Sequence, residues 1–125
     1  MAILGAHQSI AGGYYKSVET AHRLKCNCVQ LFTKNNNQWR AKELTDEDVR
    51  LFQGRVSELG IVHPLAHDSY LIKVASPDAT MWKKSVDSFV MEMLRADRLG
   101  IPYVVTHPGA YTTSSEQVGI AAVVR

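Results

Sequence analysis

Short apolar runs alternate with helical patterns along the whole sequence of 125 residues. The apolar runs, which predict strands, cover residues 2–6, 28–32, 61–66 and 101–106. The stretches with apolar residues at helical spacing cover residues 14–25, 45–59 and 76–99, and a last one opens at Ser114 with Gln117. Strands that alternate with helices predict a parallel sheet with right-handed crossovers, and hence the α/β fold class.

Four strand–helix units amount to half of an eight-unit barrel. We therefore expect a TIM (β/α)8 barrel family fold, with residues 1–125 forming the N-terminal half of a single barrel domain. The alternative is an open sheet of four strands, which would leave the outer strands unpaired. The helical pattern is still apolar at Val123 and Val124 when the sequence ends at Arg125, and this favours the truncated barrel. Unpaired edges on the first and fourth strands also predict self-association.

Capping and stop signals mark the ends of the predicted helices. Thr45 with Asp48 three residues later resembles a capping box, and Gly60 stops the same helix. Ser76 followed by Pro77 predicts an N-cap and a first helical residue. The helix that follows carries an apolar stripe that we expect to lie in the core, formed by Trp82, Val86, Phe89, Val90, Met93 and Leu94.

Composition places the chain among ordinary globular proteins and leaves the partner open. Its residues are 46% hydrophobic and 21% charged, and its net charge of +2 neither requires nor excludes a nucleic acid. No apolar run approaches the length of a membrane span and the first residues lack a secretory pattern, so we expect no membrane association. Cys26 and Cys28 are too close together for an ordinary framework disulfide, which favours packing roles in a reducing cytoplasm.

Three histidines lie where a predicted strand passes into a loop: His7, His67 and His107. In a barrel of alternating strands and helices, these strand ends meet on the face that carries the chemistry. Neutral imidazole is a good zinc ligand, so His67 and His107 are the best candidate metal ligands, although a strand-end histidine can also act as a hydrogen-bonding cap. His7 could contact the metal ligands without binding the metal itself. However, turn geometry alone also explains the glycine-rich loop that follows it.

The loops after the second and third strands carry the other candidate side chains. Asp68 could hydrogen-bond to a metal ligand and orient it, or it could be an ordinary loop acid. Tyr70 and Leu71 could wedge into a nucleic-acid stack, although the residues alone favour packing at the barrel mouth. Asn35 and Gln38 belong to a polar tract suited to phosphate or base-edge contacts, but a solvated loop is the commoner case.

Four segments of the sequence together resemble the endonuclease IV family, the zinc-dependent apurinic/apyrimidinic endonucleases. They are residues 5–13 with Gly5-Ala6-His7, residues 31–40, the run His67-Asp68-Ser69-Tyr70-Leu71-Ile72, and His107-Pro108-Gly109. Their order and spacing run through the whole chain. The resemblance implies a TIM barrel with a trinuclear zinc centre and, as substrate, double-stranded DNA that contains an abasic site.

Members of this family are class II endonucleases of the deoxyribonuclease IV type that act in DNA repair. They hydrolyse the phosphodiester 5′ to the lesion with a zinc-activated hydroxide, leaving a 3′-hydroxyl and a 5′-deoxyribose phosphate. The resemblance implies that His67 and His107 are two of the zinc ligands. It also implies that the loop after the third strand inserts at the lesion and does not serve only for packing at the barrel mouth. The DNA-contacting positions that it matches are Tyr70, Leu71, Asn35 and Gln38.

The sequence departs from the family pattern at two positions and in its length. Asn37 stands where some members have a basic residue that enters the DNA stack, and Lys73 stands where an asparagine is usual. The remaining zinc ligands, among them a bridging glutamate, come from later strands, so we expect the chain alone to be inactive. Two alternatives stay open: a metal-dependent sugar isomerase or epimerase of the same barrel type, and a non-catalytic half-barrel that needs a complementary chain.

Overall fold

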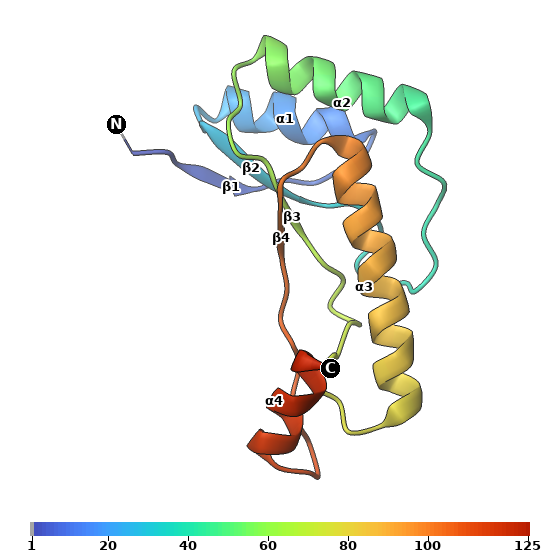
Figure 1. The fold of residues 1–125 in the computed structure, drawn as a ribbon. Coiled ribbons are helices and arrows are strands. Elements are labelled where there is room, and N and C mark those ends of the chain that lie inside the picture. Colours follow the sequence, from blue (N-terminus) through green and yellow to red (C-terminus); the bar gives the residue numbers. More distant parts are fainter. Residues whose placement is uncertain (1) are drawn as a thin grey trace.

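Four parallel strands alternate with four helices in the computed structural model, which describes residues 2–125. The elements in chain order are β1 (Gly5–His7), α1 (Tyr14–Arg23), β2 (Cys28–Phe32), α2 (Asp46–Glu58), β3 (Leu65–His67), α3 (Ala79–Leu99), β4 (Tyr103–Val105) and α4 (Glu116–Val124). The strands pair in the order β1-β2-β3-β4, as Figure 1 shows. The predicted α/β order is therefore confirmed.

Three strands are shorter than the apolar runs that predicted them. The runs 61–66 and 101–106 include Pro64 and Pro102, which lie directly before β3 and β4. Proline has no backbone N–H to donate to a ladder, so pairing begins only after it. β1 likewise pairs only from Gly5 onward. The paired segments therefore lie close to the loops that carry the candidate residues.

The register of the sheet brings the strand-end residues side by side. His7 lies opposite Gln30, Phe32 lies opposite His67, and His67 lies opposite Val105. Within residues 2–125, β1 and β4 each have a neighbouring strand on one side only. Self-association through these two edges stays a prediction.

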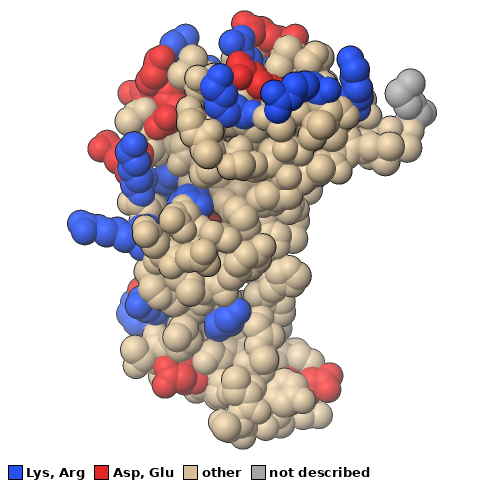
Figure 2. All heavy atoms as spheres, turned by 180° about the vertical axis from the view of Figure 1, so that it is seen from behind, with Lys and Arg blue, Asp and Glu red and all other residues tan. Residues whose placement is uncertain are grey.

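The helices α1, α2 and α3 lie on one side of the sheet, as right-handed crossovers between neighbouring parallel strands require (Figure 1). The core lies between them and the sheet, and its fully buried members include Val18, Ala21, Val29, Leu31, Phe52 and Leu99. None of these three helices covers the opposite face, where Gln30 and Phe32 stay partly exposed. Figure 2 shows few charged groups on the hollowed side of the molecule, between the N-terminal strand and α4.

The start of α2 follows the predicted capping box. Thr45 Oγ1 accepts a hydrogen bond from the backbone N of Asp48 at 3.1 Å, and Asp48 Oδ2 accepts one from the backbone N of Thr45 at 3.0 Å. Two backbone N–H groups at the start of the helix, which have no carbonyl partner within it, thereby gain an acceptor. The predicted capping box is confirmed.

The predicted N-caps Ser76 and Ser114 are wrong. Asp78 caps α3, where its Oδ1 accepts from the backbone N–H three residues on at 2.6 Å, and Ser115 caps α4 in the same way at 3.3 Å. The Ser76 hydroxyl instead accepts from the backbone N of Asp78 at 3.2 Å. Such a local turn competes with capping, and it moves the start of α3 beyond Pro77.

Cys26 and Cys28 are both free and half-buried, and Cys26 packs against the core cluster. Within residues 2–125 no helix is both long enough and apolar enough to cross a membrane.

The orientation of α3 differs from the one that its apolar stripe predicted. Its buried positions are Ser85, Ser88, Glu92, Arg95, Ala96 and Leu99. The predicted core positions Val90, Met93 and Leu94 are exposed, whereas Trp82, Val86 and Phe89 are half-buried. The physical reason is that the polar side chains of the inward face bind the backbone of neighbouring loops. Ser85 Oγ, for example, accepts from the backbone N of Lys73 at 2.9 Å.

Leu99→Ala and Leu94→Ala make the same change on the same helix and test this orientation. Leu99 is 1% exposed, so its truncation should lower the free energy of unfolding by about 2–5 kcal/mol. Leu94 is 65% exposed, so its truncation should change that free energy by less than about 0.5 kcal/mol. Urea unfolding followed by circular dichroism measures both. Equal losses of unfolding free energy in the two variants would contradict this orientation of α3 and favour the predicted one, with Leu94 in the core.

Candidate functional site

The strand-end histidines meet at the carboxyl edge of the sheet. His67 is the last residue of β3, and His107 follows β4. Their ring centroids lie 5.1 Å apart with an angle of 39° between the planes. His7, at the end of β1, is separated from this pair by Phe32, whose ring centroid lies 4.4 Å from that of His7 and 5.7 Å from that of His67. The fold therefore brings His67 and His107 together and keeps His7 to one side.

His67 is held in an orientation that leaves one ring nitrogen free. Its Nδ1 lies 2.8 Å from the backbone carbonyl oxygen of Asp68. Because a carbonyl can only accept, the proton of the neutral ring is on Nδ1 and the lone pair is on Nε2. Metal-binding histidines commonly use such a bond on the second nitrogen to fix the ring. Nε2 of His67 is therefore the atom available to a metal.

His7 has a different set of contacts. Its Nδ1 accepts from Nε2 of Gln30 at 2.9 Å, across the β1–β2 pair. The pKa of His7 is lowered, chiefly because burial disfavours the charged ring and also because His67 is nearby. A neutral His7 packed on Phe32 suits a supporting role, and that role stays a prediction.

Asp68 lies buried between the ends of β3 and β4. Its Oδ2 accepts from Oγ1 of Thr106 at 2.5 Å, and its Oδ1 lies 3.6 Å from Nδ1 of His67. Burial raises the pKa of the Asp68 carboxyl, while the Thr106 hydrogen bond and the two neighbouring histidines, His67 and His107, work against that rise. The Asp68 carboxylate is thus held in a buried, fixed position beside the histidine pair.

The residues present fit part of a zinc site. Zinc in proteins takes four ligands, or three and a water. Among residues 2–125 there is no group of three or more His, Cys, Asp or Glu side chains arranged to hold one metal ion. His67 and His107 are of the right chemical type and lie close together, so they supply a partial ligand set.

Tyr70 and Leu71 follow the histidine in the loop after β3. Tyr70 is 55% exposed, and its ring lies edge-on to Phe32 at 5.5 Å and to His67 at 5.8 Å between centroids. Leu71 is half-buried, and the next residue, Ile72, is fully buried and anchors the loop. The exposed tyrosine ring therefore stands directly beside the histidine pair.

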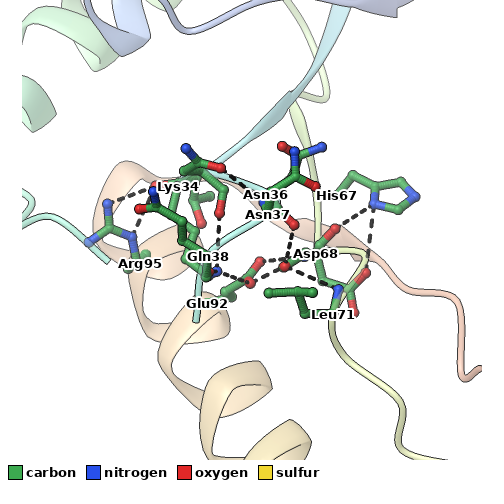
Figure 3. Close-up of polar contacts among 12 residues, drawn as sticks. Lys34, Asn36, Asn37, Gln38, His67, Asp68, Leu71, Glu92 and Arg95 are labelled. Carbon is green, nitrogen blue, oxygen red and sulfur yellow. Dashed lines mark hydrogen bonds and ion pairs between the residues drawn. The ribbon is translucent and has the colours of Figure 1, made fainter. Parts of the chain in front are cut away.

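A buried ion pair lies beneath the two loops. Nζ of Lys34 is 3.5 Å from Oε1 of Glu92, and the two side chains are only 2% and 3% exposed. Lys34 also donates to the backbone carbonyls of Asn35 and Gln38. Both carboxylate oxygens of Glu92 accept from the backbone N of Ser69, at 3.2 and 3.1 Å. Figure 3 shows Glu92 reaching from α3 to Lys34 and to the segment after His67.

Two further contacts hold the loop after β2 in place. Ser69 Oγ donates to the backbone carbonyl of Asn36 at 2.7 Å, which joins the two loops directly. The Arg95 guanidinium donates to the carbonyl oxygens of Thr33 and Lys42 and to the hydroxyl of Tyr14. Arg95 and Glu92 together make the inward face of α3 a support for both loops.

Asn35 and Gln38 are exposed at the rim of a charged cleft. Asn35 Oδ1 accepts from the backbone N of Asn37 at 2.9 Å, and Asn35 is exposed to solvent. The cleft has a volume of about 480 Å³. Its lining includes Asn35, Gln38, Lys34, Arg40, Lys42, Arg95, Glu43 and Asp48. Asn35 also borders a second cleft of about 570 Å³ that reaches His7 and Phe32.

Four residues of the site were not expected from the sequence: Phe32, Lys34, Glu92 and Arg95. The sequence places Phe32 in a strand and Lys34 in the matched segment 31–40 without giving either a role, and it gives Glu92 and Arg95 no apparent partner. A signal does exist for the last two. Glu92 and Arg95 are three residues apart, which places both on one face of α3 and marks that face as polar.

Comparisons with known proteins agree with the fold. Residues 18–125 match the model of the family described as xylose isomerase-like TIM barrel. A probable endonuclease 4 of Geotalea daltonii is 41% identical over 121 residues, which are 97% of this chain and 42% of the relative. The crystal structure of endonuclease IV from Thermus thermophilus superposes with a TM-score of 0.84 at 31% identity, over 96% of this chain and 44% of that one.

A D-psicose 3-epimerase from Clostridium cellulolyticum, crystallised with D-tagatose, has a TM-score of 0.68 at 15% identity, over 96% of this chain and 44% of that one. At this identity the likeness concerns the fold alone. The chain spans less than half the length of these relatives. The predicted TIM-barrel class and the predicted resemblance to endonuclease IV are confirmed.

Removing either imidazole should weaken the binding of zinc to the chain. We expect His67→Ala and His107→Ala each to raise the dissociation constant at least about tenfold, the lower end of the effect of losing even an outer partner of a metal ligand. Competition with a chromophoric chelator measures this constant. His22→Ala, an exposed histidine on α1, is the matched control and should leave it unchanged. If all three variants bind zinc with equal affinity, His67 and His107 do not form the zinc site.

Proposed function

Because the chain belongs to the xylose isomerase-like TIM barrel family, we propose that residues 1–125 are the N-terminal half of a single barrel domain with the activity of an endonuclease IV. Its substrate is double-stranded DNA with an abasic site, cut 5′ to the lesion to leave a 3′-hydroxyl and a 5′-deoxyribose phosphate. The names of the relatives, probable endonuclease 4 and endonuclease IV, support this choice within the family. The predicted cytoplasmic location is part of the proposal.

The observation that carries the proposal is the exposed Tyr70 ring standing against His67, which itself lies beside His107. The side chain that we propose contacts the lesion therefore lies beside one of the two proposed metal ligands, and the two proposed ligands lie beside each other. Nε2 of His67 and a ring nitrogen of His107 would hold zinc together with ligands from outside residues 1–125. Bound zinc supplies a Lewis acid and lowers the pKa of a water ligand.

The loops supply the contacts with DNA. Where a base is missing, a duplex has a gap, so the insertion of Tyr70 and Leu71 disturbs less stacking there than in intact DNA. Asn35 and Gln38 offer amide groups to the phosphate backbone, and the basic residues of the neighbouring cleft attract it. The lesion is thus recognised by the loop after β3 and the strand is positioned by the loop after β2.

The two alternatives account for less of the geometry. A sugar isomerase or epimerase uses the same fold, but binding a small polyol does not require a tyrosine that is more than half exposed. A non-catalytic half-barrel that docks a complementary chain explains the open sheet edges but gives no role to the histidine pair. The endonuclease proposal gives a role to all of these side chains.

Tyr70→Ala should weaken binding to a duplex with one abasic site by about 5- to 150-fold, because stacking of an aromatic side chain contributes about 1–3 kcal/mol. Fluorescence anisotropy with labelled duplexes measures the affinity. Tyr103→Ala is the matched control, since Tyr103 is also exposed and also lies beside a histidine, but at the opposite end of the sheet. The proposal loses its main support if both variants bind the abasic duplex as the unmodified chain does.

The chain of residues 1–125 should not cut abasic DNA, whatever the zinc concentration. Two imidazoles cannot hold the three metal ions that the resemblance implies, and the described residues contain no larger ligand group. Incubation of the purified chain with a labelled abasic duplex and zinc, followed by denaturing electrophoresis, tests this. Zinc-dependent cleavage 5′ to the lesion would overturn the expectation.

A further inference from the structure

We propose that Glu92 is a positioning residue for abasic-site recognition. Its buried carboxylate holds the loop after β3 against the loop after β2, and this sets the place from which Tyr70 and Leu71 meet the lesion. The inference rests on the proposed function, and it concerns a residue of α3 that touches neither the DNA nor the histidine pair.

The first step is the contact with Ser69, the residue directly before Tyr70. Ser69 is buried, and its backbone N–H has Glu92 as its acceptor, at 3.2 and 3.1 Å to the two carboxylate oxygens. A buried N–H without an acceptor is costly, so this bond determines where the backbone of residue 69 lies. The backbone N of Leu71 in turn donates to Ser69 Oγ at 3.3 Å.

The second step is the contact with Lys34. The ammonium group lies 3.5 Å from Glu92 Oε1 and also donates to the carbonyls of Asn35 and Gln38. Its three N–H groups are therefore directed at Glu92 and at the backbone of the loop after β2. A charge so deeply buried is stable only when it is paired, so each member of the pair holds the other in place.

The position of the Tyr70 ring depends on its backbone and on neighbouring rings. Tyr70 is more than half exposed, so burial does not determine the position of its ring. Its place follows from its backbone, which is anchored at Ser69, and from edge contacts with Phe32 and His67. A shift of residue 69 is therefore transmitted to the ring that meets the lesion.

A purely structural role is a poor explanation for a charge at this position. Replacing a buried ion pair by apolar side chains of similar volume often leaves a protein equally stable or more stable. Apolar residues at positions 34 and 92 together would satisfy the packing there, but the one at position 92 could accept nothing from Ser69. What the carboxylate adds is the fixed spacing of the two loops.

The test compares the affinity for a duplex with one tetrahydrofuran abasic analogue and for the same duplex without it, in residues 1–125 and in variants. Partial unfolding lowers both apparent affinities by the same factor, so their ratio does not report stability. Glu92→Met should lower the ratio by at least about tenfold, the lower end of the factor expected for the loss of one hydrogen bond to a charged group. Glu92→Gln should keep most of it, since its amide oxygen can still accept from Ser69.

Leu99→Ala is the control on the same helix, because Leu99 belongs to the core cluster and should lower stability without changing the ratio. If Glu92→Met does not fold, Glu92→Asp takes its place, since the shorter side chain withdraws the carboxylate from Ser69 but keeps the charge. An unchanged ratio in the Glu92 variant, or an equal loss in Leu99→Ala, would overturn the inference and leave the proposed function standing. No preference for abasic DNA in the unmodified chain would overturn the proposed function and the inference with it.

Discussion

The contact between Lys34 and Glu92 is the one on which the rest of the candidate site depends. Both side chains are buried, and neither charge would be stable there alone. Lys34 belongs to the loop after β2, whereas Glu92 accepts the N–H of Ser69 in the loop after β3. One charge pair therefore fixes two loops on α3, and the exposed side chains of the site are held through their backbone.

Local patterns in the sequence determine the order of the elements and much of the site. β2 coincides with its apolar run, and Thr45 begins a helix because a capping box involves residues only three apart. The proximity of His67 and His107 could also be predicted, since a parallel sheet brings the carboxyl ends of neighbouring strands together. In these cases the physical cause lies within a few residues or follows from the topology alone.

The orientation of α3 could not be predicted in this way. An apolar stripe normally turns toward the core, but here the polar side chains Glu92 and Arg95 turn inward instead. Burial is favourable for Glu92 because it meets Lys34 and the backbone of Ser69, and for Arg95 because it meets the backbone of Thr33. The two backbone contacts join residues that are 23 and 62 positions apart. Contacts at such separations leave no periodic mark in the sequence. The cap at Asp78 was missed for a related reason, because the nearby Ser76 hydroxyl is equally suited to a cap and forms a turn instead.

The bond from Ser69 to Glu92 uses the main chain at position 69 and a side chain at position 92. As far as this bond is concerned, any residue except proline can occupy position 69. The ion pair is more demanding, because an acid at position 92 requires a base at position 34. Among related sequences, substitutions at positions 34 and 92 should therefore occur together. The bond from the main chain of residue 69 places no such demand on the side chain at that position.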